Sequence, residues 1–261
     1  MELTIVGSSG SASGPDSPAS CYLVRTTYEG RTYSLVLDLG PGSFGQLYRY
    51  LDPATIDAIG LSHLHADHCL DLTGFFVAAT YSPTAPWPSI PVYGPAGTAQ
   101  RMAAAYDVPG ALPEPDPGIA DRFDYRSWQP SQQIGPFALT SIPAAHPVDA
   151  YSFRVTDPAG ASLVFTGDTG PNPALAELAL GADLLLSEAA FLDAPDNPPG
   201  VHLSGRDAAR IATRAQVGRL VLTHIPAWLS AEQVIAEAVP HFAGPIDLAA
   251  PGRTFFVGAS A

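Results

Sequence analysis

Lysine is absent from this sequence of 261 residues, so all 12 of its basic side chains are arginines. Asp and Glu number 25, and 12 − 25 gives a formal net charge of −13 at pH 7. A protein that holds nucleic acid mainly by its phosphates needs a basic face, so this balance argues against nucleic acid as a partner. We expect the acidic surface to serve solubility.

Cysteine and long apolar runs are also scarce. Cys21 and Cys69 are too few for a disulfide scaffold, which favours a reducing, cytoplasmic compartment. No apolar run approaches the ~18 residues that a membrane span needs, and the start lacks the basic and apolar segments of a signal peptide. We therefore predict a cytoplasmic protein with no membrane segment.

Apolar residues make up 46% of the sequence, enough for a sizeable core. Short apolar runs alternate with helical patterns in both halves, which predicts layered α/β packing. Ser204 is expected to cap one helix, and Ser230 with Gln233 forms a capping-box pattern for another. The Pro- and Gly-rich stretch from Val108 to Asp121 is the best candidate for a linker. The predicted strands are 3–6, 21–27, 33–37, 58–61, 137–142, 151–156, 162–166, 184–187, 220–222 and 254–257; the predicted helices are 71–77, 96–106, 172–180, 205–216 and 231–239.

The segment from His63 to His68 reads His-Leu-His-Ala-Asp-His and directly follows an apolar, strand-like run. Imidazole and carboxylate groups at a strand-to-loop junction are what a metal site needs, because the strand below holds them rigidly. His63 and His65 can point the same way, whereas Asp67 and His68 turn toward a second position. The spacing therefore predicts two metal ions.

Three further donors each follow a predicted strand. They are His146, Asp168 and His224, and each enters a loop that contains glycine or proline. Alone, each would more often be an ordinary loop residue than a ligand. Together with the first cluster they make about the number of donors that two ions with an open position require.

The order H-x-H-x-D-H, then histidine, then aspartate in Gly-Asp-Thr, then a late histidine resembles the metallo-β-lactamase superfamily over essentially the whole chain. The resemblance implies an αββα four-layer sandwich of the α/β class, a single domain over 1–261 with similar halves of about 1–120 and 121–261. Asp38 resembles the acidic strand end that supports the ligand loop, although a turn-capping aspartate remains the alternative. The implied ligands are His63, His65 and His146 for one ion, Asp67, His68 and His224 for the other, and Asp168 for both.

Two downstream segments resemble the Glu and His pair of the ribonuclease Z-like group. They are Ser-Glu-Ala-Ala-Phe around Glu188 and His-Leu-Ser at His202. The resemblance implies that His202, held by Glu188, assists the leaving-group oxygen, and that Asp67 orients the attacking water. Without it, Glu188 could be a surface acid at a strand end and His202 an ordinary loop histidine.

Within this group, the sequence is similar to the compact actinobacterial proteins that hydrolyse cyclic nucleotides, notably over residues 14–20, 61–72, 202–205 and 222–226. This implies two divalent ions, zinc first with manganese or iron as alternatives, a small phosphodiester substrate such as 3',5'-cAMP, and a homodimer. Ribonuclease Z is disfavoured because its long tRNA-gripping arm has no obvious counterpart here, and because a chain without lysine and with a net charge of −13 matches tRNA poorly.

The other functions that we weigh are tRNA 3' processing of the ribonuclease Z type, a lactonase or thioesterase, and a metal-binding scaffold without turnover. Two interpretations of the loop from Ser8 to Gly14 also stay open: backbone N–H groups that bind phosphate, or a plain turn.

Overall fold

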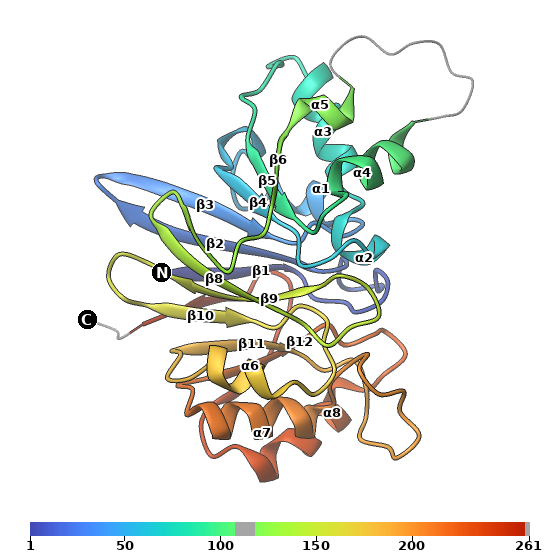
Figure 1. Cartoon of the computed structure of the whole chain (residues 1–261), viewed down its shortest axis with the longest axis vertical. Helices are drawn as coiled ribbons and strands as arrows, with labels where there is room; N and C mark the ends of the chain where they lie inside the picture. Colours follow the sequence, from blue (N-terminus) through green and yellow to red (C-terminus); the bar gives the residue numbers. More distant parts are fainter. Residues whose placement is uncertain (108–117, 259–261) are drawn as a thin grey trace.

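The computed structural model describes residues 1–107 and 118–258, so most of the predicted linker from Val108 to Asp121 lies outside the described residues. Two seven-stranded sheets pack face to face, with helices on both outer faces (Figure 1). This is the predicted αββα fold. The predicted division into halves near residue 120 stays a prediction.

The first sheet has the strand order β14-β1-β2-β3-β4-β5-β6, so a strand from the end of the chain joins those of the beginning. Its strands are β1 Glu2–Gly7, β2 Cys21–Tyr28, β3 Arg31–Leu37, β4 Ala58–Gly60, β5 Pro91–Gly94, β6 Asp124–Ser127 and β14 Thr254–Phe256. Over it lie α1 Ser43–Leu47, α2 Ala66–Cys69, α3 Leu72–Tyr81, α4 Thr98–Tyr106 and α5 Ile119–Arg122, with a 3₁₀ turn at Pro53–Thr55.

The second sheet has the order β13-β12-β11-β10-β9-β8-β7. Its strands are β7 Ser131–Ile134, β8 Phe137–Pro143, β9 Tyr151–Thr156, β10 Ser162–Phe165, β11 Leu184–Glu188, β12 Leu220–Thr223 and β13 Ile246–Leu248. Helices α6 Pro173–Leu178, α7 Gly205–Ala215 and α8 Ala231–Ala238 cover its outer face, followed by a 3₁₀ turn at Val239–His241.

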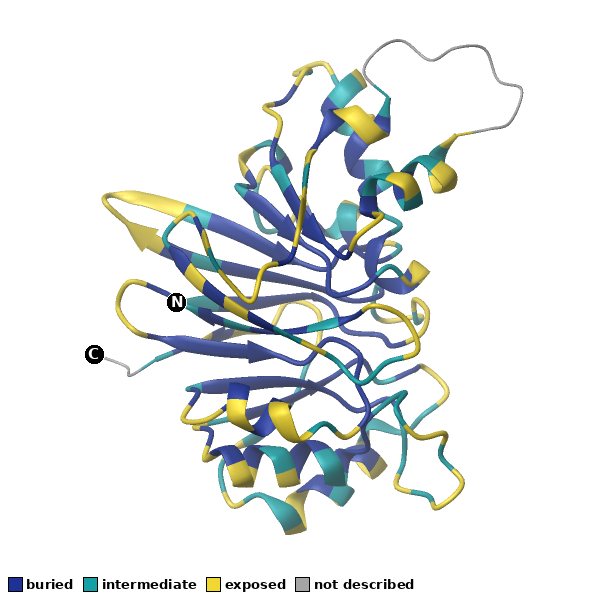
Figure 2. Ribbon diagram, viewed as in Figure 1, coloured by how far each residue is buried: buried dark blue, intermediate teal, exposed yellow. Residues whose placement is uncertain are grey.

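Side-chain alternation along the strands sorts the apolar residues into three layers. In β3, Leu35 and Leu37 join the core between the sheets, whereas Val36 faces the helices α1 to α5. In β11, Leu184 joins the inter-sheet core and Leu185 packs under α6 to α8. The central strands are therefore buried on both faces (Figure 2).

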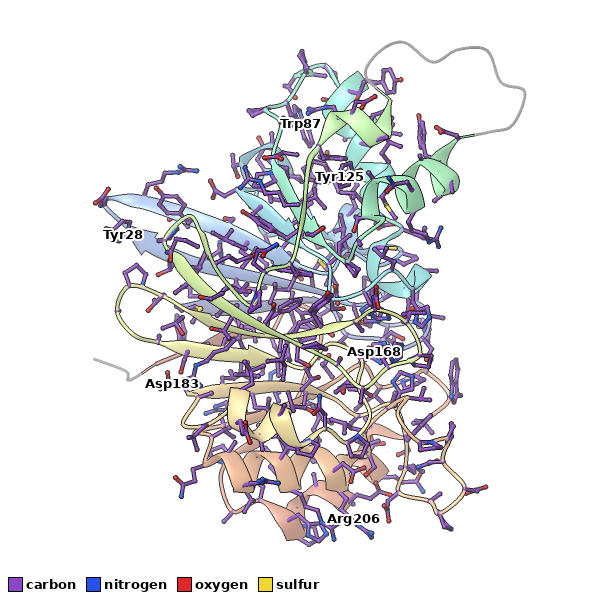
Figure 3. All side chains as sticks on the ribbon, in the orientation of Figure 1. Tyr28, Trp87, Tyr125, Asp168, Asp183 and Arg206 are labelled. Carbon is purple, nitrogen blue, oxygen red and sulfur yellow. The ribbon has the colours of Figure 1, made fainter. Side chains whose placement is uncertain are left out.

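The directions of the strands determine where polar side chains that follow them can come together. Strands β3 to β6 are parallel, and so are β10 to β13, while β8 and β10 each pair antiparallel with β9. The carboxyl ends of β8, β10, β11 and β12 therefore lie along one edge of the second sheet, the edge where ligands bind in open α/β sheets. In Figure 3, Asp168 lies at this edge, and Tyr28, at the tip of the β2–β3 hairpin, lies at the other end of the molecule.

Several short elements differ from the sequence expectation. Strands β6 and β7 are polar and β13 is three residues long, so none carries the apolar run that predicts a strand. Helix α4 begins at Thr98 rather than at 96. The reciprocal capping box forms between Ser204 and Asp207, whereas the Ser230 hydroxyl accepts the Gln233 amide and donates to Glu232. No helix among the described residues is long and apolar enough to cross a bilayer.

Candidate metal centre

All seven predicted ligands come together at this edge, from loops and short helices that follow strands of both sheets. His63 and His65 follow β4, and Asp67 and His68 lie in the four-residue helix α2. His146 follows β8, Asp168 follows β10 and His224 follows β12. Because each side chain starts from the end of a packed strand or next to one, its position is set by the core.

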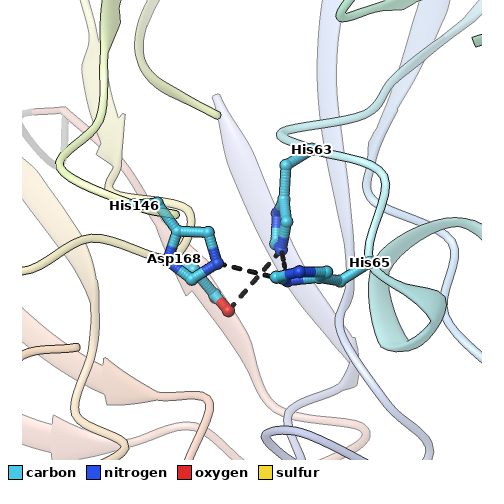
Figure 4. A group of neighbouring side chains, drawn as sticks. All are labelled: His63, His65, His146 and Asp168. Atoms are coloured by element: carbon cyan, nitrogen blue, oxygen red, sulfur yellow. Dashed lines mark hydrogen bonds and ion pairs between the residues drawn. The ribbon is translucent and has the colours of Figure 1, made fainter. Parts of the chain in front are cut away.

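The first donor group is His63, His65, His146 and Asp168 (Figure 4). The Nε2 atom of His63 lies 3.0 Å from Nδ1 of His65, which lies 3.2 Å from Nε2 of His146. Oδ2 of Asp168 lies 3.7 Å from the His63 Nε2. Ligands held about 2.0–2.1 Å from a tetrahedral metal ion are separated from one another by about 3.3 Å, so these spacings fit one ion.

The second donor group is Asp67, His68, Asp168 and His224. Nε2 of His224 lies 3.1 Å from both the His68 Nε2 and the Asp67 Oδ2. Oδ1 of Asp168 completes the group at 3.3 Å from the His68 Nε2. Asp168 therefore offers one carboxylate oxygen to each group, which is the arrangement of a bridging ligand.

The donor atoms themselves test whether a cation fits. Oδ1 of Asp168 is buried and has no hydrogen-bond partner among the described residues. Nδ1 of His65 lies at hydrogen-bond distance from Nε2 of both His63 and His146. Each nitrogen of a neutral imidazole carries either a lone pair or an N–H, so three nitrogens that meet in this way suit a shared cation. A buried carboxylate oxygen without a donor is costly, and a cation between the donors removes that cost. The clusters thus fit a dinuclear metal site.

Asp38 supports the second group from behind. Its Oδ2 lies 2.7 Å from Nδ1 of His68, and its Oδ1 accepts the Ser62 amide at 2.6 Å. The Ser62 hydroxyl donates to Oδ2 of Asp38 at 2.9 Å. A carboxylate that accepts the Nδ1–H of a histidine orients the ring and leaves Nε2 free for a metal ion.

A backbone carbonyl performs the same task for the first group. Nδ1 of His146 donates to the carbonyl oxygen of Val201 at 3.0 Å, which leaves its Nε2 facing His65. Sequence reasoning missed Val201, because a carbonyl is the same in every residue type. It also missed Ser62, for which the signal was available: the serine directly precedes His63.

Burial and neighbouring charges shift the pKa values of the histidines in opposite directions. Burial and the neighbouring His68 lower the pKa of His63 to about 2, so this ring is neutral as a ligand must be. Burial lowers the pKa of His68 too, but Asp168 and Asp38 outweigh it and hold the pKa well above its usual value. His68 therefore gives up a proton when it binds a cation.

The loop around Asp168 depends on glycine. Gly167 has φ +55°, and a Cβ there would lie 2.8 Å from the carbonyl oxygen of Tyr151. The turn lets the chain leave β10 and place Asp168 between the two donor groups within three residues.

Glu188 and His202 lie beside the donors as a pair. Oε1 of Glu188 lies 3.0 Å from Nδ1 of His202 and accepts the Thr169 amide at 2.7 Å. Glu188 is fully buried at the end of β11, and the His202 ring is 3.9 Å from Asp168. Burial alone would lower the pKa of His202, but the hydrogen bond and charge of Glu188 raise it above its ordinary value. The raised pKa favours the protonated form of this imidazole, which lies beside Asp168.

Known proteins share this fold and much of the sequence. The sequence profile of the Beta-lactamase superfamily domain matches residues 33–225. An uncharacterized protein of Mycobacterium leprae, ML1173, is 47% identical over 261 residues, which cover 99% of this chain and 89% of that protein. The ribonuclease Z of Nocardia farcinica is 27% identical over 95% of both chains.

The Bacillus subtilis protein YhfI, named a probable metallo-hydrolase, is 29% identical over 97% of this chain and 98% of its own. Its crystal structure superimposes with a TM-score of 0.82, at 27% identity, over 98% of this chain and 99% of that one. Human tRNase Z, short form, has the same fold at a TM-score of 0.72 and 20% identity, over 99% of this chain and all of that one. The chain therefore belongs to the metallo-β-lactamase superfamily, among its ribonuclease Z-like and YhfI-like members.

Proposed function

We propose that this metallo-hydrolase cleaves phosphodiesters and that its substrate is a small cyclic nucleotide of the 3',5'-cAMP type. The observation that carries the proposal is the pair Glu188–His202. Glu188 fixes the His202 ring beside the two donor groups, and neither His202 nor Glu188 is needed to complete those two groups. A phosphodiester with an alcohol leaving group needs such an acid, since the alkoxide is a poor leaving group without a proton.

The residues divide the chemistry between them. Two divalent ions held by the donor groups would supply positive charge near the phosphoryl oxygens and would lower the pKa of a water molecule. Asp67, whose Oδ2 faces His68 and His224, would orient the attacking water through its other carboxylate oxygen. Glu188 accepts the Nδ1–H of His202, and this leaves the His202 Nε2 to protonate the leaving oxygen.

Charge supports a small substrate over tRNA. The chain carries a net charge of −13 and no lysine, a poor match for a polyanion. Similarity to the ribonuclease Z of Nocardia farcinica favours tRNA 3' processing as the second candidate. We further propose zinc as the native metal, because histidine-rich tetrahedral groups suit it, and a homodimer as the assembly.

The test is turnover by the metal-loaded protein of 3',5'-cAMP, 2',3'-cAMP, bis(p-nitrophenyl) phosphate, a precursor tRNA and a simple lactone. We expect linear nucleotide from at least one cyclic nucleotide, with loss of turnover after chelation. His241→Ala is the matched control, because His241 lies in the 3₁₀ turn after α8, away from the donor groups. Cleavage confined to the precursor tRNA or to the lactone would overturn the proposal.

A further inference from the structure

The loop between β1 and β2 is held by its own amides. The loop lies against the segment that follows β12, through bridges of Ser9 with Ala19 and with Ile225. Five amides of residues 8–14 donate to oxygens of the loop or its neighbours. They are those of Ser8 to the Ser17 hydroxyl at 2.9 Å, Ser9 to Pro18 at 3.1 Å, Gly10 to Ile225 at 3.3 Å, Ala12 to Gly10 at 2.7 Å and Gly14 to Ser17 at 2.8 Å. These hydrogen bonds therefore fix the conformation of the loop.

The Ser11 amide is different, because it points at the metal centre. Its N–H donates to Nε2 of His224 at 3.3 Å, and that nitrogen is a corner of the second donor group. Ser11 is exposed and has φ +60°, whereas Gly10 beneath it is buried. The turn thus presents one backbone donor to the Nε2 of the buried His224.

Gly10 permits this close approach. A Cβ on Gly10 would lie 2.1 Å from the carbonyl oxygen of His224 and 2.9 Å from its Nδ1. Any side chain at this position would push the loop away from His224 and carry the Ser11 amide with it. The glycine therefore positions Ser11 relative to the donor group.

The lone pair of His224 cannot serve two partners. An imidazole Nε2 has a single lone pair, and a cation in the second donor group would use it. The Ser11 N–H would then be free to donate to another acceptor at the edge of the centre, because Ser11 is exposed. An anionic oxygen bound to the centre is the acceptor that fits, as backbone donors beside a developing negative charge do in hydrolases.

We infer that the Ser11 backbone N–H binds a phosphoryl oxygen of the substrate next to the second donor group, with Gly10 as its positioning residue. The identity of the anion rests on the proposed function; the placement of the donor does not.

The first test uses inorganic phosphate as the probe and the zinc-loaded full chain. Amide spectra of ¹⁵N-labelled protein are recorded during a phosphate titration. We expect the Ser11 proton resonance to move downfield to saturation, with a much smaller shift at Ala12, whose amide stays within the turn. A Ser11 resonance that responds to zinc but not to phosphate would overturn the inference, because the amide would then serve His224 alone.

The second test removes the N–H itself. Cys21 allows a synthetic peptide of residues 1–20 to be ligated to a chain that begins at Cys21, so Ser11 can be replaced by its hydroxy acid, which has an ester oxygen in place of the N–H. We expect bound zinc to be unchanged, and phosphate affinity and kcat/KM each to fall about tenfold or more.

The matched control places the ester at Ala12. This change removes the turn bond that the Ala12 amide donates to Gly10 but keeps the Ser11 N–H, so phosphate affinity should change by less than about threefold. Equal losses in the two esters, or loss of zinc from the Ser11 ester, would refute the inference. Phosphate binding that depends on Ser11 in a protein that cleaves no phosphodiester would refute only the proposed function.

Discussion

At the residue scale, the histidines of the site differ in their proton affinity. The pKa of His63 is lowered, whereas the pKa values of His68 and His202 are raised above the ordinary histidine value. The difference lies in the neighbours, because carboxylates contact His68 and His202 at hydrogen-bond distance whereas His63 packs among imidazoles. Substitutions should therefore separate catalysis from metal binding.

His202→Ala should lower kcat for 3',5'-cAMP by about 100-fold or more, because the leaving oxygen loses its proton donor. Turnover of bis(p-nitrophenyl) phosphate should fall far less, since its leaving group departs as the anion. Steady-state kinetics on both substrates checks this, with His241→Ala as the control and zinc content measured alongside. Equal losses on both substrates would contradict a role as acid.

Asp168→Asn should lower bound zinc from two ions per chain to one at most. Its two oxygens face separate donor groups, at 3.3 Å from His68 and 3.7 Å from His63, and an amide nitrogen cannot bind a cation. Elemental analysis after dialysis measures this. Glu29→Gln, an exposed carboxylate at the β2–β3 turn, is the control, and full zinc content in Asp168→Asn would show that the residue does not bridge.

At the scale of elements, hydrogen-bonded carboxylates connect strand ends. Asp38 follows β3 and joins Ser62 after β4 to His68 in α2, so it connects two strand ends of the first sheet to the helix that carries Asp67 and His68. Asp157, after β9, accepts the Thr26 hydroxyl of β2 and the Ala161 amide before β10. One carboxylate serves the centre, and the other connects the two sheets away from it.

Asp38→Asn should weaken zinc binding by about 10- to 100-fold while the fold persists. Asn tolerates the positive φ of 58° at this position, so the change removes the charge behind His68 rather than the turn. Competition with a chelator of known affinity measures the loss. Unchanged affinity would mean that Asp38 only caps its turn.

Asp157→Asn should destabilise the protein by about 1–3 kcal/mol at pH 7. Burial would raise the pKa of Asp157, but hydrogen bonds from Thr26 and Ala161 outweigh it and hold the pKa below the ordinary 3.8. Because the folded pKa is depressed, this stability is present above pH 3.8 and is lost as the pH falls through the folded value. Urea unfolding of both proteins from pH 7 to 3 should show the gap closing; a constant gap would contradict the assignment.

At the scale of the whole molecule, the metal centre joins the two sheets. His63, His65, Asp67 and His68 follow strands of the first sheet, whereas His146, Asp168 and His224 follow strands of the second. Ions bound by both sets would hold these edges together, and binding to the folded state alone would stabilise it by mass action.

Removal of the metal should therefore lower the melting temperature. Zinc at about 1,000 times its dissociation constant would add about 4 kcal/mol to the free energy of unfolding. Differential scanning calorimetry with and without a chelator measures the difference. A variant with Asp168→Asn and His224→Ala should show a smaller difference, because the second donor group loses two of its ligands, and a shift of full size in that variant would place the stabilising metal elsewhere.

The sequence by itself determined the strand pattern, the fold class and the residue types at the centre. Short apolar runs predict most strands because burial on both faces of a sheet selects apolar side chains along the whole strand, whereas the edge strands β6 and β7 escape prediction because they bury little. The spacing from His63 to His68 likewise indicates metal chemistry, since few other functions need those side chains together.

Only the tertiary structure decided which groups meet. His63 and His146 lie 83 positions apart along the chain, and no local sequence pattern indicates that their ring centroids lie 4.9 Å from each other. The Val201 carbonyl and the Ser11 N–H take part through the backbone, which is the same in every residue, so no sequence pattern marks them. Side-chain chemistry can be read along the chain, but the position of a backbone group follows from how the two sheets pack.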